Sequence, residues 1–76
     1  MKLHPFDMKR RLIANAYRTK KYEKVKHSSK KYLAKHPNDI MVLELFARAH
    51  VSCQEWGTAL PIYGQLFEID PGYRDV

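Results

Sequence analysis

The sequence predicts an all-α fold built from two antiparallel helix-turn-helix hairpins, and three observations support this prediction. Pro37 and Pro71 each follow a helix-like segment, and their positions differ by 34 (71 − 37). Apolar residues recur every three or four positions, the period of an amphipathic helix, and no segment alternates long enough to predict a strand. A repeat period of about 20 to 50 residues is typical of stacked units that cannot bury their apolar faces alone. At 76 residues the chain should form one small domain, 1–76.

Four helices are expected, at about 6–19, 21–36, 39–54 and 56–70. The first two would form repeat 1, at about 6–38, and the last two repeat 2, at about 39–72, with 72–76 opening a further helix. The apolar stripes of the first pair consist of Leu12, Ile13, Ala16, Tyr17, Tyr22, Val25, Ser29, Tyr32 and Leu33. Those of the second pair consist of Ile40, Leu43, Phe46, Ala47, Val51, Trp56, Ala59, Leu60, Tyr63, Leu66 and Phe67.

The turn residues fit these boundaries. The residue before a proline is pushed out of the helical region, so Pro37 and Pro71 should end the second and fourth helices. Asp39 follows the first of these prolines and is placed to cap the third helix. Pro61 conflicts with its surroundings, because a proline in the second turn removes a hydrogen bond and clashes with the preceding turn. The fourth helix is therefore expected to begin late, near Thr58, or to bend.

Repeat 2 carries a recognisable pattern: Leu43-x-x-Phe46-Ala47-x-x-His50, then Ala59-x-x-x-Tyr63, then Pro71. It resembles the tetratricopeptide (TPR) pattern W-x-x-L-G-x-x-Y…A-x-x-x-F…P. Repeat 1 fits less well, through Arg10-x-x-Ile13-Ala14-x-x-Tyr17, then Val25-x-x-x-Ser29, then Pro37. Before the turn its matches stand at an offset of 33 from those of repeat 2 (47 − 14 and 50 − 17), which predicts a turn one residue shorter. Ala14 and Ala47 should then lie where two helices cross closely.

The TPR resemblance implies a right-handed superhelical segment that acts as a non-catalytic protein-interaction module and presents a concave groove to a partner peptide or helix. The first helix of each unit lines that groove in the family. The groove positions so implied are Met8, Arg11, Asn15, Arg18, Thr19, Met41, Glu44, Leu45, Arg48 and Ser52. Arg11 and Asn15 resemble part of a carboxylate clamp of some TPR co-chaperones, but Leu45 stands where a second asparagine would complete it. An acidic or extended peptide, bound through the arginines, fits this set better.

Charge is distributed unevenly along the chain. Residues 1–36 carry 12 Lys and Arg against two acids, whereas residues 37–76 carry two Arg against six acids. Four lysines form a stripe on the second helix: Lys20, Lys24, Lys31 and Lys35. The stripe is either a solvated outer face or a docking surface for an anionic partner, such as nucleic acid or a membrane surface. The near absence of arginine and of stacking motifs argues against nucleic acid. The asymmetry also allows basic and acidic repeats to meet head-to-tail.

The C-terminal hairpin carries more apolar surface than the third helix can cover. The chain is therefore expected to be part of a longer protein or to self-associate through a face made of Trp56, Tyr63, Leu66 and Phe67. The sequence contains no apolar run of transmembrane length and no apolar signal segment, which predicts a cytoplasmic protein.

Several residues that often carry chemistry fit structural roles better. Cys53 is alone and is expected to be a buried thiol at a helix end. His50 replaces a tyrosine of the repeat pattern and is expected to be packed and hydrogen-bonded. No spacing of His, Cys and acidic residues predicts a metal site, a cofactor or catalysis. A non-catalytic N-terminal arm of a larger enzyme remains an alternative to the interaction module.

Overall fold

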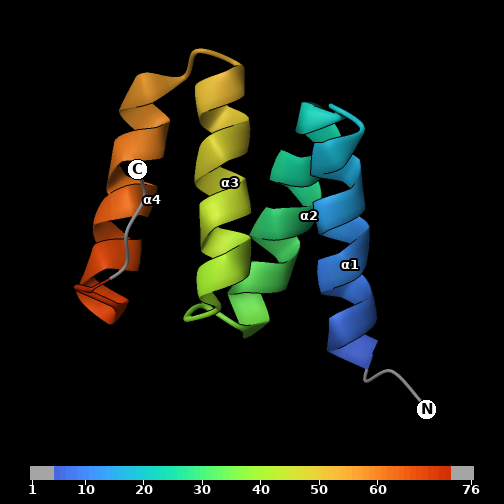
Figure 1. Cartoon of the computed structure of the whole chain (residues 1–76), viewed down its shortest axis with the longest axis horizontal. Helices are drawn as coiled ribbons and strands as arrows, with labels where there is room; N and C mark the ends of the chain where they lie inside the picture. The colour runs from blue at the N-terminus through green and yellow to red at the C-terminus, as the bar shows by residue number, and fades with distance from the viewer. Residues whose placement is uncertain (1–4, 73–76) are drawn as a thin grey trace.

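The computed structural model describes residues 5–72 and consists of four α-helices. They are α1 (Pro5–Arg18), α2 (Tyr22–Lys35), α3 (Ile40–Ser52) and α4 (Trp56–Ile69) (Figure 1). The all-α prediction is confirmed, and the expected bounds differ from the observed ones by at most two residues. The expected opening of a further helix at 72–76 lies outside the described residues, apart from Gly72.

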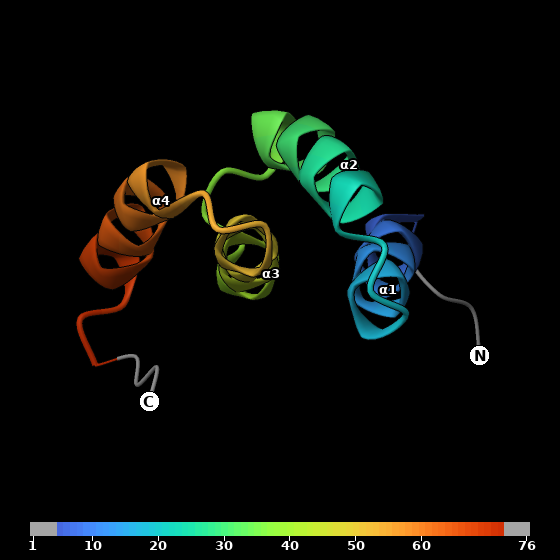
Figure 2. The ribbon, with the colours of Figure 1, turned by 90° about the horizontal axis from the view of Figure 1, so that it is seen from above.

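Neighbouring helices pair in an antiparallel manner, so α1 with α2 and α3 with α4 form two hairpins (Figure 1). Helix α3 also packs against both α1 and α2, whereas α4 packs its backbone against α3 alone among the described helices. Seen from above, the helices follow one another in a curved row, with α2 above α1 and α3 (Figure 2). The molecule is therefore a stack of two hairpins with α1 and α4 at its ends.

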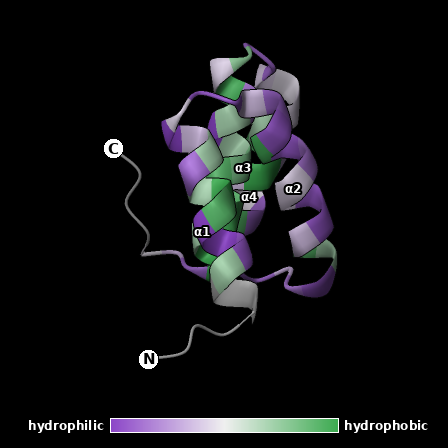
Figure 3. Ribbon diagram, turned by 90° about the vertical axis from the view of Figure 1, so that its right-hand side faces the viewer, coloured by the Kyte–Doolittle hydropathy of each residue, from purple (hydrophilic) through white to green (hydrophobic). Residues whose placement is uncertain are grey.

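The core is made of two clusters joined by one residue. The first fills the space between α1, α2 and α3 and comprises Ile13, Ala16, Val25, Tyr32, Val42 and Ala49. The second lies between α3 and α4 and comprises Leu43, Ala47, Ile62 and Leu66. Leu33 of α2 packs against both clusters and so connects the two hairpins. Hydrophobic residues gather between the helices, while α2 turns a largely hydrophilic face outward (Figure 3). Burial of each large apolar side chain contributes about 1.5–3 kcal/mol.

The two hairpins share a single register, in which corresponding positions differ by 34. The last residues of α1 and α3 differ by 34, and so do the first and the last residues of α2 and α4. The turn inside each hairpin has three residues, 19–21 and 53–55. Each turn also contains one residue with positive φ, Lys20 at 64° and Gln54 at 61°. The predicted shorter turn in repeat 1 is therefore wrong, because the two turns have the same length and each has a left-handed residue at the same position.

This register changes the expected helix crossing in repeat 1. Ala47 is fully buried and corresponds to Ile13, which is 2% exposed, rather than to Ala14, which is only half-buried. The close approach that Ala47 allows in the second hairpin is therefore not repeated by Ala14 in the first. Ala16 is the buried alanine of α1, and it belongs to the first core cluster.

The predicted cap is confirmed, and the late start of α4 is not. Asp39 is the N-cap of α3, and its side chain accepts a hydrogen bond from the Val42 amide at 3.3 Å. Helix α4 begins at Trp56 and continues through Pro61. Pro61 and Gly57, whose carbonyl loses its intrahelical partner, are both exposed, so water can satisfy that carbonyl.

Candidate interaction surfaces

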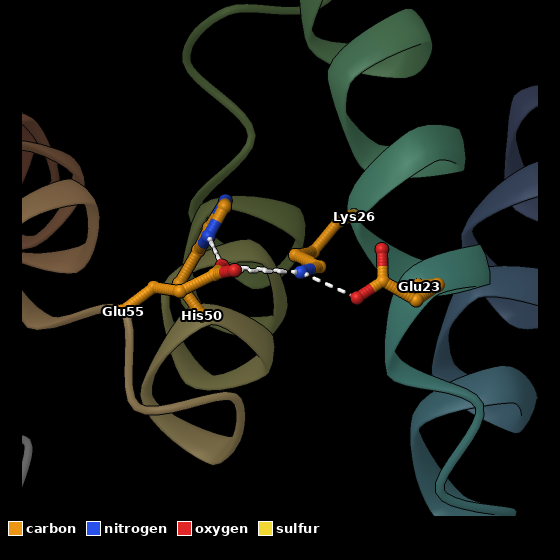
Figure 4. A network of polar contacts seen from close by, with 4 residues as sticks. All are labelled: Glu23, Lys26, His50 and Glu55. Atoms are coloured by element: carbon orange, nitrogen blue, oxygen red, sulfur yellow. Dashed lines mark hydrogen bonds and ion pairs between the residues drawn. The ribbon is translucent and has the colours of Figure 1, made fainter.

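One polar network ties the two hairpins together (Figure 4). Lys26 of α2 donates to both oxygens of Glu55, at 3.1 and 3.3 Å, and lies 2.8 Å from Glu23 Oε2. Glu55, the residue before α4, also lies 2.7 Å from Nδ1 of His50 near the end of α3. The lysine side chain is 13% exposed, so the ion pair is partly shielded from water. These contacts hold α2 against the turn between α3 and α4.

The pairing in this network shifts two pKa values in the directions that favour charge. The nearby Glu23 carboxylate, followed by Glu55 and Cys53, raises the pKa of Lys26 above its ordinary range, against the opposing effect of burial. The hydrogen bond with His50, followed by that with Lys26, lowers the pKa of Glu55 below its usual 4.5. The His50 ring packs at an angle against Phe46, with ring centroids 4.9 Å apart. His50 is therefore packed and hydrogen-bonded, as expected, and the half-buried Cys53 is the C-cap of α3.

A second polar tie lies at the opposite end of α3. The Tyr32 hydroxyl donates to Asp39 Oδ2 at 2.8 Å, and the Arg10 guanidinium lies 3.6 Å from the same oxygen. The other oxygen of Asp39 caps α3, so one carboxylate connects α1, α2 and α3. Burial, together with the hydrogen bond to Asp39, raises the pKa of Tyr32. The Lys26–Glu55 and Arg10–Asp39 pairs join residues far apart in the sequence, and helical periodicity does not predict either pair.

The exposed side of α3 contains most of the groove positions implied in repeat 2. Met41 is 36% exposed, Ser52 is exposed, and Glu44 and Arg48 form an ion pair at 2.8 Å one turn apart. Leu45 differs from these four because its side chain packs against the first core cluster. It therefore contributes to packing between the hairpins rather than to an open groove.

The α1 positions do not all join this face. The 34-residue register pairs Met8 with Val42, Arg11 with Leu45, and Asn15 with Ala49. These three α3 residues pack in or against the first core cluster, which means that they face the first hairpin. The matching α1 residues, all exposed, thus lie on the side of α1 that points away from α3. The 34-residue register therefore does not place them on the same side as Arg48, because Met8 and Asn15 match Met41 and Arg48 only at an offset of 33.

Two arginines of α1 remain on the side shared with α3. Arg18 corresponds to Ser52 and is exposed, and its guanidinium donates to the Asn15 side chain one turn away. Arg10 corresponds to Glu44 and contacts Asp39 at the start of α3. Arg10 was not among the expected groove residues, because the repeat pattern matched it to the leading tryptophan. Thr19 lies just beyond α1 and bonds back to the Asn15 and Ala16 carbonyls.

The lysine stripe on α2 divides into two parts. Lys20, Lys24, Lys31 and Lys35 are all exposed, and within the described part of the chain none of the four forms an ion pair. Lys31 and Lys35 line a groove of about 490 Å³ between α1 and α2. The other residues of this α1–α2 groove are Lys9, Leu12, Ile13, Ser28, Tyr32 and His36. Lys24 lies in the first turn of α2, whereas Lys20 lies before the helix, in the turn 19–21, and so does not belong to the stripe on α2.

The predicted apolar face on α4 is only partly available. Trp56 and Phe67 are 58% and 40% exposed, and Tyr63 stacks on Phe67 with ring centroids 6.3 Å apart. Leu66 is fully buried against α3 and cannot contact a partner, so its place on that face is corrected. Leu60, which is 69% exposed, was assigned to the helix stripe and belongs instead to the exposed surface. Helical periodicity alone does not distinguish the side of α4 that faces α3 from the adjacent exposed side of the same helix.

Within residues 5–72, no cluster of three or more His, Cys, Asp or Glu side chains could hold a metal ion. None of the four described helices is long and apolar enough to cross a membrane. Comparisons with protein-family models, curated protein sequences and solved structures gave no significant match.

Proposed function

We propose that this chain is a non-catalytic protein-interaction module of the TPR type, which binds an acidic, extended peptide along the side shared by α1 and α3. The observation that carries this proposal is the common 34-residue register of the two hairpins. Helices α1 and α3 run in the same direction (Figure 1) and pack against each other, so the shared register lets them present corresponding positions to one side of the stack. Repeated surfaces of this kind suit recognition of an extended chain.

The chemistry of this side favours carboxylates. Arg18 and Arg48 contribute guanidinium groups, which suit bidentate binding of a carboxylate. Arg48 is engaged by Glu44 in an ion pair whose arginine side chain is 42% exposed. An exposed pair of this kind contributes little to stability, so a peptide carboxylate can replace Glu44 at low cost. Met41 adds an adaptable apolar contact beside them.

The test is the binding of a labelled extended peptide rich in Asp and Glu, followed by fluorescence polarisation. Replacing Arg18 and Arg48 with alanine should weaken binding at least about tenfold, because each charge-assisted hydrogen bond lost costs about 1.5–3 kcal/mol. Replacing Lys24 and Lys31, two exposed lysines of α2, is the matched control and should have little effect. No binding by the unaltered chain would reject the proposal.

A second candidate is docking of the α2 lysines onto an anionic polymer or membrane surface. The observation that favours it is that Lys20, Lys24, Lys31 and Lys35 are exposed without ion pairs among the described residues. Binding through such lysines should fall steeply as salt increases, whereas peptide binding with an apolar contact should fall modestly. The ranking of the two double variants would then be reversed. A cytoplasmic location stays a prediction under both candidates.

A further inference from the structure

The contact between the two hairpins involves two surfaces, and residues at corresponding positions form similar surfaces at the two ends of the molecule. Inside the chain, the C-terminal part of α2 and the following turn lie against α3 and α4. The residues that line the space between them are Lys30, Leu33, Ala34 and Pro37 on one side and Leu43, Phe46, Ile62 and Gln65 on the other, and Leu33 packs against the second core cluster. The Gln65 amide donates to the Pro37 carbonyl at 3.3 Å and closes the contact.

The 34-residue register places matching surfaces at both ends of the stack. The residues that correspond to the accepting side are Lys9, Leu12, Ser28 and Lys31, and all four line the α1–α2 groove. The residues that correspond to the inserted side are Gly64, Phe67, Glu68 and Pro71, which we call the α4 face. All of these residues except the half-buried Ser28 are exposed. The groove thus has the form of a site for a helix like α4.

Exposed apolar side chains gather at these same two ends. Leu12 is 66% exposed and Met8 is 56% exposed on α1, while Leu60 and Phe67 are 69% and 40% exposed on α4. Helices α1 and α4 lie at opposite ends of the row, so no single molecule can bring the two surfaces together (Figure 1). A second copy can do so, and it would remove both apolar surfaces from water.

The charges of the two surfaces are complementary. Lys9, Lys31 and Lys35 line the α1–α2 groove. The sequence has no Lys or Arg from Ala49 to Gly72, and Glu68 on the α4 face takes the position that Ala34 has in the internal contact. In the internal contact Gln65 bonds the Pro37 carbonyl, and the corresponding groove residue, Lys31, can donate to the Pro71 carbonyl or pair with Glu68.

We propose that copies of this chain associate head-to-tail, with the α4 face of one copy seated in the α1–α2 groove of the next. Such a contact joins two different surfaces, so each copy keeps one free groove and one free α4 face, and the assembly does not close at a dimer. The Lys26–Glu55 tie of the internal contact has no counterpart, because Leu60 and Lys21 occupy the corresponding positions. The contact between copies is therefore weaker than the internal one, and association depends on concentration.

Sedimentation velocity across a wide concentration range tests this geometry with two variants, Leu12→Glu in the groove and Phe67→Glu on the α4 face. Each variant alone should remain monomeric at concentrations where the unaltered chain forms dimers and larger species. An equal mixture of the two should form a dimer and nothing larger, because one intact groove meets one intact α4 face. Circular dichroism and thermal unfolding of each variant check that it folds.

Three results would overturn the proposal. The first is a monomeric unaltered chain at every concentration, and the second is self-association that Leu12→Glu leaves unchanged, which would indicate symmetric pairing of two α4 faces. The third is a mixture of the two variants that stays monomeric although both are folded. Each of these readouts is independent of peptide binding, so the proposed function can fail or hold separately.

A charge reversal adds a control that leaves the apolar contacts intact. Lys31→Glu should weaken association, and combining it in a mixture with Glu68→Lys should restore association. Lys24→Glu is the matched control, because Lys24 is an exposed lysine of the same helix outside the groove. Equal effects of Lys24→Glu and Lys31→Glu would indicate a response to net charge alone and would contradict the pairing with Glu68.

Discussion

Lys20 and Gln54 have nearly the same left-handed backbone conformation, with φ of 64° and 61°, and they occupy equivalent positions in the two hairpins. Each closes the turn inside one hairpin just after the first helix ends. Glycine adopts the left-handed conformation most easily, whereas lysine and glutamine adopt it at a steric cost. The recurrence of an unfavourable conformation at the same position shows how closely the two turns correspond.

The first prediction tests this turn with one substitution at two exposed lysines. Lys20→Gly should raise the free energy of unfolding by about 0.5–1 kcal/mol, because it relieves a left-handed strain of about 1–2 kcal/mol at some cost in chain entropy. Lys24→Gly, inside α2, removes the same charge but should lower it by about 1 kcal/mol. Urea unfolding measures both. A loss of stability in Lys20→Gly would contradict the strained turn.

The second prediction concerns the helix crossing in each hairpin. Ala47→Leu should cost about 1–3 kcal/mol, because a fully buried alanine has no room for the added atoms. Ala14→Leu should cost clearly less, since Ala14 is half-buried and does not correspond to Ala47. Thermal unfolding of the two variants distinguishes the registers. Equal costs would support the 33-residue offset that the structure contradicts.

The third prediction concerns acid. The pKa of Glu55 is lowered from 4.5 in the folded chain, so the folded state binds fewer protons than the unfolded state as the pH falls below this value. The stability that Glu55 contributes is therefore fully present above about pH 4.5 and is lost as the pH falls through its folded pKa. Glu55→Gln should flatten this part of the curve of stability against pH, and Lys26→Met should flatten it partially. An unchanged curve in Glu55→Gln would show that the network does not favour the carboxylate.

The fourth prediction concerns alkali. The pKa of Tyr32 is raised from 10.0, so its neutral hydroxyl stabilises the fold below that pH, and the contribution is lost as the pH rises through the folded pKa. Tyr32→Phe should flatten the loss of stability above pH 10.0. It should also cost about 1 kcal/mol at neutral pH, because Asp39 loses a hydrogen bond. The pKa of Lys26 is also raised, so this lysine contributes to the same loss of stability at high pH. Unfolding of Lys26→Met over the same pH range measures the contribution of the lysine separately from that of Tyr32.

The sequence was sufficient to predict the four helices and the Asp39 cap, because both depend on neighbouring residues. The register of the first hairpin was not predictable from the pattern, since Ala14 and Tyr17 match repeat 2 at an offset of 33, while the helices and the turn match it at 34. A difference of one residue between the two offsets changes which side of α1 is expected to face α3. The groove positions on α1 were expected from the offset of 33, so they do not match those on α3 at the observed offset of 34.

Polar contacts between residues far apart in the sequence were not predictable from it either. Lys26 and Glu55 lie 29 residues apart, and Lys26 is one of several lysines on α2 that the sequence does not distinguish. Only the packing of α2 against the α3–α4 turn selects it. Leu66 was misjudged for a related reason, because an apolar residue on a terminal helix can face the core or a partner with the same periodicity.

The sequential packing of the helices has a consequence for the kinetics of folding. Every described helix finds its partners among the next two along the chain, so the entropy lost on closing the intervening loops is small and folding should be fast. Helix α4 packs its backbone against α3 alone, so it can detach without disturbing the first core cluster. Amide protons of α4 should therefore exchange with solvent sooner than those of α3, which is held from both sides.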